Sequence, residues 1–145
     1  MQLLQTPVQL GLTVVWLLVS IFVLVRGGWL ERVAMTLVIV ASLASPLVQD
    51  FSRLHATQWG LMAVDGVLFL ALALMTWRHD KPWLPWAAGF QLMTVVTHFG
   101  KALHPDILGR AYISTSYLLF IGLLASLAWG AALSREQPLD RDRTA

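Results

Sequence analysis

The sequence carries little charge and no cysteine. Asp, Glu, Lys and Arg make up only 12% of its 145 residues, about half of the share in an average soluble domain. So few charged side chains cannot cover a soluble globule of this size, which excludes an ordinary cytosolic domain. The ten basic residues exceed the eight acidic ones by only two, so nucleic-acid binding has no electrostatic support. Without cysteine, disulfide bonds, thiol catalysis and cysteine-based metal sites are excluded.

Motifs of catalysis and metal binding are absent as well. The chain contains no G-x-S-x-G, no H-E-x-x-H and no cluster of carboxylates on one helical face, so we predict no catalytic residue. No two of the four histidines have the i, i+4 spacing of helix-borne metal sites, and we predict neither a metal site nor a cofactor. A haem bound by His98 together with His55 is the one arrangement that the histidines leave open, although a lone histidine more often makes structural hydrogen bonds.

Long apolar runs dominate the chain, of which 57% is hydrophobic. A helix that crosses a bilayer needs about 20 apolar residues. Short connections make consecutive helices antiparallel neighbours. The sequence therefore predicts an all-α membrane protein, a compact bundle of five transmembrane helices within residues 1–133, followed by a polar cytoplasmic tail over 134–145. The expected helices cover residues 8–25, 33–48, 60–77, 83–103 and 111–133.

The distribution of basic residues predicts the orientation of the bundle. Counted on alternate sides of the membrane, one side carries Arg26, Arg32, Arg78, Lys81, Arg135, Arg141 and Arg143. The other side carries Arg53, Lys101 and Arg110. Because cytoplasmic loops hold the excess of Lys and Arg, we predict the N-terminus outside and the C-terminus inside.

Two ionisable residues fall inside the predicted spans. Asp65 lies six residues after Trp59, which puts it about 9 Å into the outer half of the third helix. An Asp at the centre of a membrane helix costs about 2.5–3.5 kcal/mol, so Asp65 should face the interior and have a partner. His98 lies at a similar depth in the fourth helix, and an Asp65–His98 hydrogen bond or ion pair is geometrically allowed. This pair is either a structural contact or part of a working site, and the sequence leaves both interpretations open.

Other polar residues are expected near this pair. Four residues of the fourth segment share one helical face because they recur at spacings of three, four and three: Gln91, Thr94, His98 and Lys101. Tyr112 begins the fifth helix, and Ser42, Ser45 and Gln49 end the second. Together with Asp65, these residues are candidates for an outward-facing ligand pocket. In the alternative interpretation, the small polar residues only make hydrogen bonds between helices and Lys101 reaches the lipid head groups.

Small residues mark a possible packing face on the fifth helix. Gly122, Ser126 and Gly130 recur every four residues, a pattern that lets another helix approach closely. The pattern does not distinguish packing within the bundle from packing against a partner chain.

The segment 26–32 reads Arg-Gly-Gly-Trp-Leu-Glu-Arg. Gly27 and Gly28 permit a tight turn, Trp29 anchors it at the membrane interface, and Glu31 favours the positive end of the following helix. This segment resembles one in a family of small bacterial polytopic inner-membrane proteins. The resemblance implies a bacterial inner membrane and no known activity.

Three classes of function remain. The first expectation is an accessory or scaffold subunit of a larger membrane complex, such as a respiratory or photosynthetic one, that packs through its helices against other integral subunits or a second copy. The alternative is a binder or carrier of a small lipophilic or polar ligand, using the pocket around Asp65 and His98. An enzyme acting on a lipid, quinone or isoprenoid is disfavoured by the scarcity of reactive groups.

Overall fold

The computed structural model describes residues 7–48, 59–103 and 109–134. These residues form five helices, which confirms the predicted all-α fold: α1 (Pro7–Arg26), α2 (Trp29–Val48), α3 (Trp59–Arg78), α4 (Trp83–Leu103) and α5 (Gly109–Leu133). The largest difference from the predicted bounds is at α2, which begins at Trp29 rather than near Val33. The backbone N–H of Arg32 donates to the carbonyl of Gly28, so Trp29, Leu30 and Glu31 already belong to the first helical turn. The tail 135–145 lies outside the described residues.

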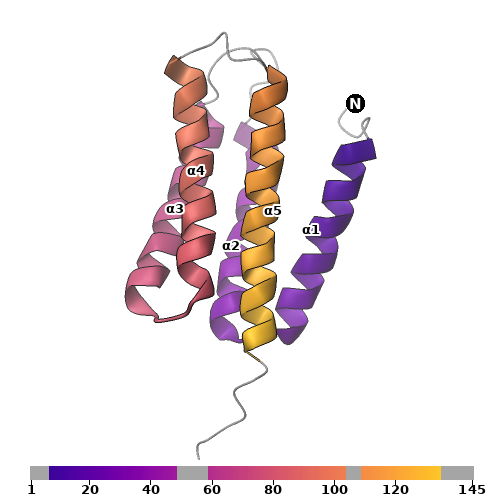
Figure 1. Ribbon diagram of the computed structural model, residues 1–145, viewed down its shortest axis with the longest axis vertical. Coiled ribbons are helices and arrows are strands. Elements are labelled where there is room, and N and C mark those ends of the chain that lie inside the picture. Colours follow the sequence, from indigo (N-terminus) through magenta and orange to yellow (C-terminus); the bar gives the residue numbers. More distant parts are fainter. Residues whose placement is uncertain (1–6, 49–58, 104–108, 135–145) are drawn as a thin grey trace, which may run out of the picture.

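The helices are arranged antiparallel around a ring (Figure 1). Each helix packs against its neighbours in the chain, α5 closes the ring against α1, and α2 also contacts α5. The short turns at 27–28 and 79–82 lie at the same end of the bundle, which we call the turn end. The opposite end, where α1 begins, is the N-terminal end. Figure 1 shows that α1 diverges from α5 towards this N-terminal end.

The turn between α1 and α2 depends on its two glycines because of space. A Cβ atom on Gly27 would lie 2.6 Å from the carbonyl oxygen of Val23, and one on Gly28 would lie 2.8 Å from Oε2 of Glu31. Neither glycine has a positive φ, so close approach rather than backbone conformation requires them. Arg32 completes the turn, because its Nε donates to the carbonyl of Gly27 at 2.9 Å.

The buried apolar core lies in the half of the bundle next to the turn end. It uses the last turns of α1 and α5 and the first turns of α2 and α4. The buried apolar side chains are Val23, Leu30, Ala34, Met35, Val38, Leu68, Leu72, Trp83, Leu84, Ala87, Ala88, Leu123, Leu124, Leu127 and Ala131. The half towards the N-terminal end is packed less tightly, and the polar residues discussed below lie there.

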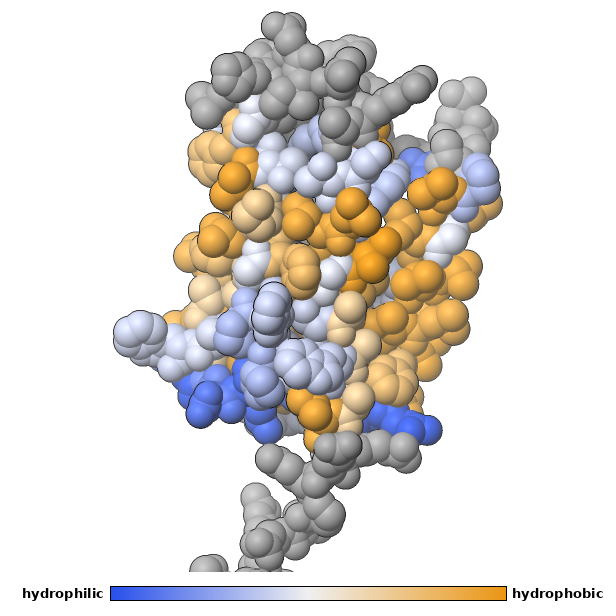
Figure 2. Space-filling view, in the orientation of Figure 1, coloured by the Kyte–Doolittle hydropathy of each residue, from blue (hydrophilic) through white to orange (hydrophobic). Residues whose placement is uncertain are grey.

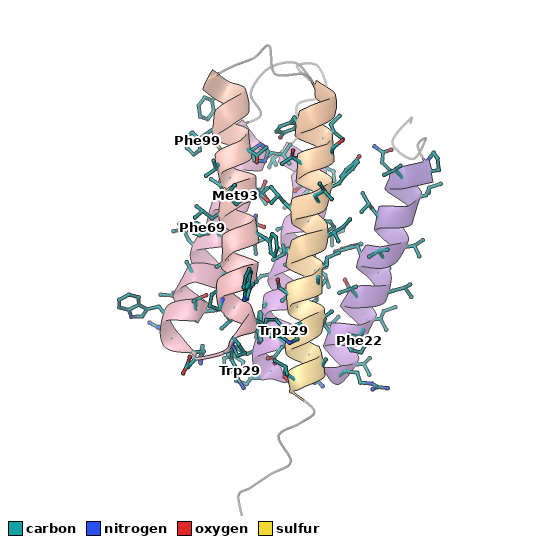
Figure 3. All side chains as sticks on the ribbon, in the orientation of Figure 1. Phe22, Trp29, Phe69, Met93, Phe99 and Trp129 are labelled. Atoms are coloured by element: carbon teal, nitrogen blue, oxygen red, sulfur yellow. The ribbon has the colours of Figure 1, made fainter. Side chains whose placement is uncertain are left out.

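The outer surface of the bundle is apolar. Large side chains such as Val25, Leu47 and Val67 are exposed, and Phe22 and Phe99 point away from the bundle (Figure 3). Figure 2 shows apolar side chains across the middle of this face and the most hydrophilic ones at the turn end. An exposed apolar surface of this extent fits a lipid environment and not water.

Within the described residues, four helical segments are long and apolar enough to cross a membrane: α1, α2, α3 and the Tyr112–Leu133 part of α5. The chain thus has the features of an integral membrane protein. The helix α4 does not belong to this set, because polar residues such as Gln91 and His98 lower its hydropathy. It is nevertheless packed between α3 and α5.

Candidate functional site

Asp65 extends from α3 towards α4, and both of its carboxylate oxygens have a partner there. Oδ2 lies 2.9 Å from Nε2 of His98. Oδ1 accepts a hydrogen bond of 2.9 Å from Nε2 of Gln91, which also approaches the backbone carbonyl of Asp65 at 3.3 Å. Asp65 and His98 thus form the contact that their similar depths in the predicted helices allow. Gln91 is a second partner of Asp65 and lies on the same face of α4 as His98.

Tyr112 of α5 extends this arrangement on the far side of His98. Its hydroxyl lies 2.9 Å from Nδ1 of His98, and the two rings meet edge to face with centroids 5.8 Å apart. An ionised Asp65 accepts a hydrogen bond from Nε2–H of His98. The Nδ1 atom of a neutral His98 therefore accepts a hydrogen bond from the Tyr112 hydroxyl, whereas a protonated His98 donates one to the tyrosine oxygen. Asp65, Gln91, His98 and Tyr112 form a hydrogen-bonded chain across three helices, which we call the Asp65 network.

The spacing along α4 explains how one carboxylate reaches two partners. Gln91 and His98 are seven residues apart, two helical turns on the same face and about 10.5 Å along the axis. Asp65 lies between them and accepts from both. A carboxylate inside a membrane protein is tolerated when hydrogen bonds and a basic group compensate for its lost hydration. Gln91 and His98 supply this compensation.

A cavity of about 390 Å³ lies beside the Asp65 network. All four members of the network line it, together with Thr94, which was predicted for the same pocket. Further polar lining comes from Gln9, Ser42, Ser45, Ser116 and Tyr117. The apolar part of the wall consists of Val38, Ala41, Leu61, Leu68, Ile113, Phe120 and Leu123. By area, the wall of the pocket is mostly apolar, and several hydrogen-bonding side chains interrupt it. This combination is typical of small-molecule sites.

Three hydroxyl side chains of the pocket bond within their own helices, and not between helices as the alternative interpretation had it. The hydroxyl of Thr94 donates to the carbonyl of Phe90, and Ser45 and Ser116 likewise bond to the carbonyl four residues earlier in their own helices. This local bond is the usual one for a Ser or Thr within a helix, where the carbonyl is the nearest acceptor. Contacts between helices come instead from the longer polar side chains.

Some predicted residues lie outside the part of the chain that the structure describes. Gln49 and His55 lie outside the described residues. Lys101 belongs to α4, but the structure does not describe its side chain. The haem on His98 and His55 that the sequence left open meets a geometric obstacle at His98. Both ring nitrogens of His98 have hydrogen-bond partners, so an iron atom would have to displace either Asp65 or Tyr112.

The small-residue face of α5 packs inside the bundle. A Cβ atom on Gly122 would lie 2.5 Å from the ring of Phe90, and one on Gly130 would lie 2.7 Å from the ring of Trp83. Ser126, between them, is buried and donates to the carbonyl of Gly122. Of the two possibilities that the sequence left open, the structure shows packing against α4 of the same chain.

A second polar contact between helices lies at the turn end, and sequence reasoning missed it. Glu31 is only 2% exposed, and its Oε1 accepts a 2.9 Å hydrogen bond from the indole Nε1 of the buried Trp83. The sequence suggested only a favourable charge at the start of a helix. The signal that points to burial is the pair of glycines before Glu31, because Gly28 leaves room for its carboxylate.

Comparison of the chain with protein families, curated proteins and solved structures gives no match.

Proposed function

We propose that the protein binds a small ligand in the cavity beside the Asp65 network and acts as a membrane-embedded binding protein or carrier. The observation that carries this proposal is the position of the network. Its carboxylate, imidazole and phenol line a cavity of about 390 Å³ rather than a closed core.

The chemistry of the cavity favours a ligand with both apolar and hydrogen-bonding parts. His98 and Tyr112 each both donate and accept hydrogen bonds, whereas an ionised Asp65 only accepts. The His98 side chain is 10% exposed and the Asp65 side chain 19% exposed, so both remain reachable from the cavity. The remaining wall is largely apolar. A ligand whose polar group replaces one hydrogen-bond partner in the network would be bound by polar contacts at that end and by apolar contacts elsewhere.

For the membrane topology, we propose that α4 crosses the membrane together with the other helices and that the N-terminal end faces outside. The packing of α4 between α3 and α5 and the apolar residues on its outer face, such as Met93 and Phe99, support the fifth span. Arg26 and Arg78 end helices at the turn end, which supports a cytoplasmic position for that end. The resemblance of segment 26–32 supports a bacterial inner membrane.

The binding proposal is tested by molecules that co-purify with the protein. Wild-type protein, Asp65→Asn and His98→Ala are purified in mild detergent, and the bound molecules are extracted and identified by mass spectrometry. We expect one species to be enriched on the wild type and reduced at least about tenfold in both variants, because a hydrogen bond to a charged group contributes about 1.5–3 kcal/mol.

The matched control is Thr97→Val, on the same helix, whose hydroxyl bonds only to the carbonyl of Met93. It should retain the bound species at the wild-type level. Equal amounts of every co-purified molecule in all four proteins, at equal yield of folded protein, would refute the binding function.

An accessory subunit is the second candidate, and a different surface favours it. An apolar groove of about 340 Å³ lies between α2 and α3, and its lining combines Leu and Val side chains with four small residues, Ala41, Ala44, Ala63 and Ala71. Small residues let a helix of another chain approach closely. The same purification tests this candidate. A second subunit or copy that is retained by the wild type and lost in Ala63→Leu supports it, and a monomer in mild detergent contradicts it.

A further inference from the structure

We propose that the ligand of the Asp65 network is an uncharged lipid that reaches the cavity sideways from the bilayer, through a cleft between α1, α2 and α5. This inference rests on the proposed binding function and adds the class of ligand and its path. The cleft, which we call the α1 cleft, has a volume of about 480 Å³. Its walls are Gln9, Leu12, Thr13, Trp16, Ser42, Leu43, Tyr117 and Phe120.

The α1 cleft and the cavity adjoin one another. Four residues line both spaces: Gln9, Ser42, Tyr117 and Phe120. Both spaces lie in the half of the bundle towards the N-terminal end, where α1 diverges from α5 (Figure 1). A molecule whose polar end contacts the Asp65 network can therefore extend between α1 and its neighbours to the lipid.

The wall of the α1 cleft includes Trp16, whose indole carries a hydrogen-bond donor. The indole Nε1 of Trp16 is buried and has no hydrogen-bond partner among the described residues. Trp16 lies nine residues after Pro7, about 13.5 Å along α1 and well below the head groups. Water is scarce at this depth, so an unpaired N–H is unfavourable there. This N–H has no exposed surface, so a carbonyl or hydroxyl oxygen of a lipid in the α1 cleft would accept its hydrogen bond once the Trp16 ring turns towards the cleft.

The charges around both spaces favour an uncharged lipid. Within the described residues, no Lys or Arg lines the cavity or the α1 cleft, and the carboxylate of Asp65 in the cavity wall repels an anionic head group. A cationic head group would compete with His98 and Gln91, which already occupy both carboxylate oxygens. A hydroxyl or carbonyl head group can join the network without adding a charge. Leu12, Leu43 and Phe120 offer apolar contacts to its chain.

The absence of cysteine permits a direct test of the path. Single cysteines are placed at Thr13, which lines the α1 cleft, and at Val14, which is 54% exposed and lines neither space. Each variant is reconstituted in nanodiscs, treated with N-ethylmaleimide or left untreated, and photolabelled with hexadecanol carrying a diazirine and an alkyne. The adduct at Thr13→Cys should abolish most labelling of the peptides that line the cavity. The same adduct at Val14→Cys should leave it unchanged.

A second variant tests the hydrogen bond within the α1 cleft. Trp16→Phe keeps an aromatic ring and removes the donor, and it should weaken the apparent affinity for the hexadecanol probe about two- to tenfold, as expected for one neutral hydrogen bond. Trp129→Phe, at a partly exposed tryptophan that lines neither space, is the control. Hexadecanoic acid with the same diazirine should label the cavity more weakly than the alcohol at neutral pH.

The outcomes separate this inference from the binding function. If Asp65→Asn abolishes labelling but the Thr13→Cys adduct does not, the site stands and the lateral path is wrong. If the acid labels as strongly as the alcohol, or if the wild type is not labelled in the cavity, the ligand class is wrong, whereas the co-purified molecules still decide the binding function. Unfolding temperatures of all variants identify any that lose labelling through misfolding.

Discussion

Inside the bundle, two carboxylates are held in different ways. Asp65 accepts from a histidine and an amide and borders a cavity, so it has both a basic neighbour and room for a ligand. Glu31 is 2% exposed and accepts a side-chain hydrogen bond from a single neutral donor, the indole of Trp83. Glu31 also lines a space, of about 360 Å³, at the turn end. The difference lies in the partners: a carboxylate beside an imidazole can exchange a proton, whereas the indole of Trp83 can only donate a hydrogen bond, which suits a structural contact between α2 and α4.

The contact between Glu31 and Trp83 leads to a stability prediction. Glu31→Ala leaves the buried Trp83 N–H without an acceptor and should lower the free energy of unfolding by about 1–3 kcal/mol. Glu31→Gln keeps an oxygen acceptor of the same size and should lower it by less. Equilibrium unfolding in mixed micelles measures both values. If the Gln variant is as unstable as the Ala variant, the negative charge rather than the hydrogen bond stabilises this contact.

Among the helices, α4 has the central role. It contributes to the polar contacts with α2 and α3, and it packs more extensively against α5 than any other two helices pack together. Its face towards α5 carries Phe90 and Trp83, whose rings occupy the space over Gly122 and Gly130. Its face towards α3 carries Gln91 and supplies the partners of Asp65. The polar residues that reduce the hydropathy of α4 are thus the same residues that form the site.

The pair α4 and α5 yields a prediction with an internal control. Gly130→Ala places a methyl group 2.7 Å from the ring of Trp83, which is only 1% exposed and is held in place by its hydrogen bond to Glu31. We expect a loss of about 1–3 kcal/mol, as for overpacked cores. Gly89→Ala on α4 meets nothing within 4 Å and should stabilise the helix by about 0.5–1 kcal/mol. Thermal unfolding in detergent compares the two, and equal effects would show that α5 tolerates the extra methyl group.

For the whole molecule, the spacing of residues along each helix and their expected depth in the membrane predicted the features that lie within one helix or at one level of the membrane. The five helices follow from the apolar runs, and the Asp65–His98 contact follows from two helices that are neighbours in the chain. The contact between Glu31 and Trp83 joins residues 52 positions apart, and it depends on which faces of α2 and α4 meet. The α1 cleft could not be predicted from the sequence either, because it depends on the tilt of α1 relative to α5. Neither relation is encoded in the spacing of residues along one helix.

The number of membrane crossings decides on which side each end of the bundle lies, and the cysteine-free chain makes this measurable. Asp80→Cys probes the turn between α3 and α4, and Ala132→Cys probes the last turn of α5; both positions are exposed. If α4 crosses the membrane, the two cysteines lie on the same side, and the excess of positive charge predicts that this side is cytoplasmic. A membrane-impermeant maleimide should then label both in inverted vesicles and neither in intact cells.

Val67→Cys, exposed on the apolar surface of α3, should resist the reagent in both preparations. Labelling of Asp80→Cys and Ala132→Cys from opposite sides would show that α4 does not cross, and the cavity would then not be enclosed by five membrane-spanning helices.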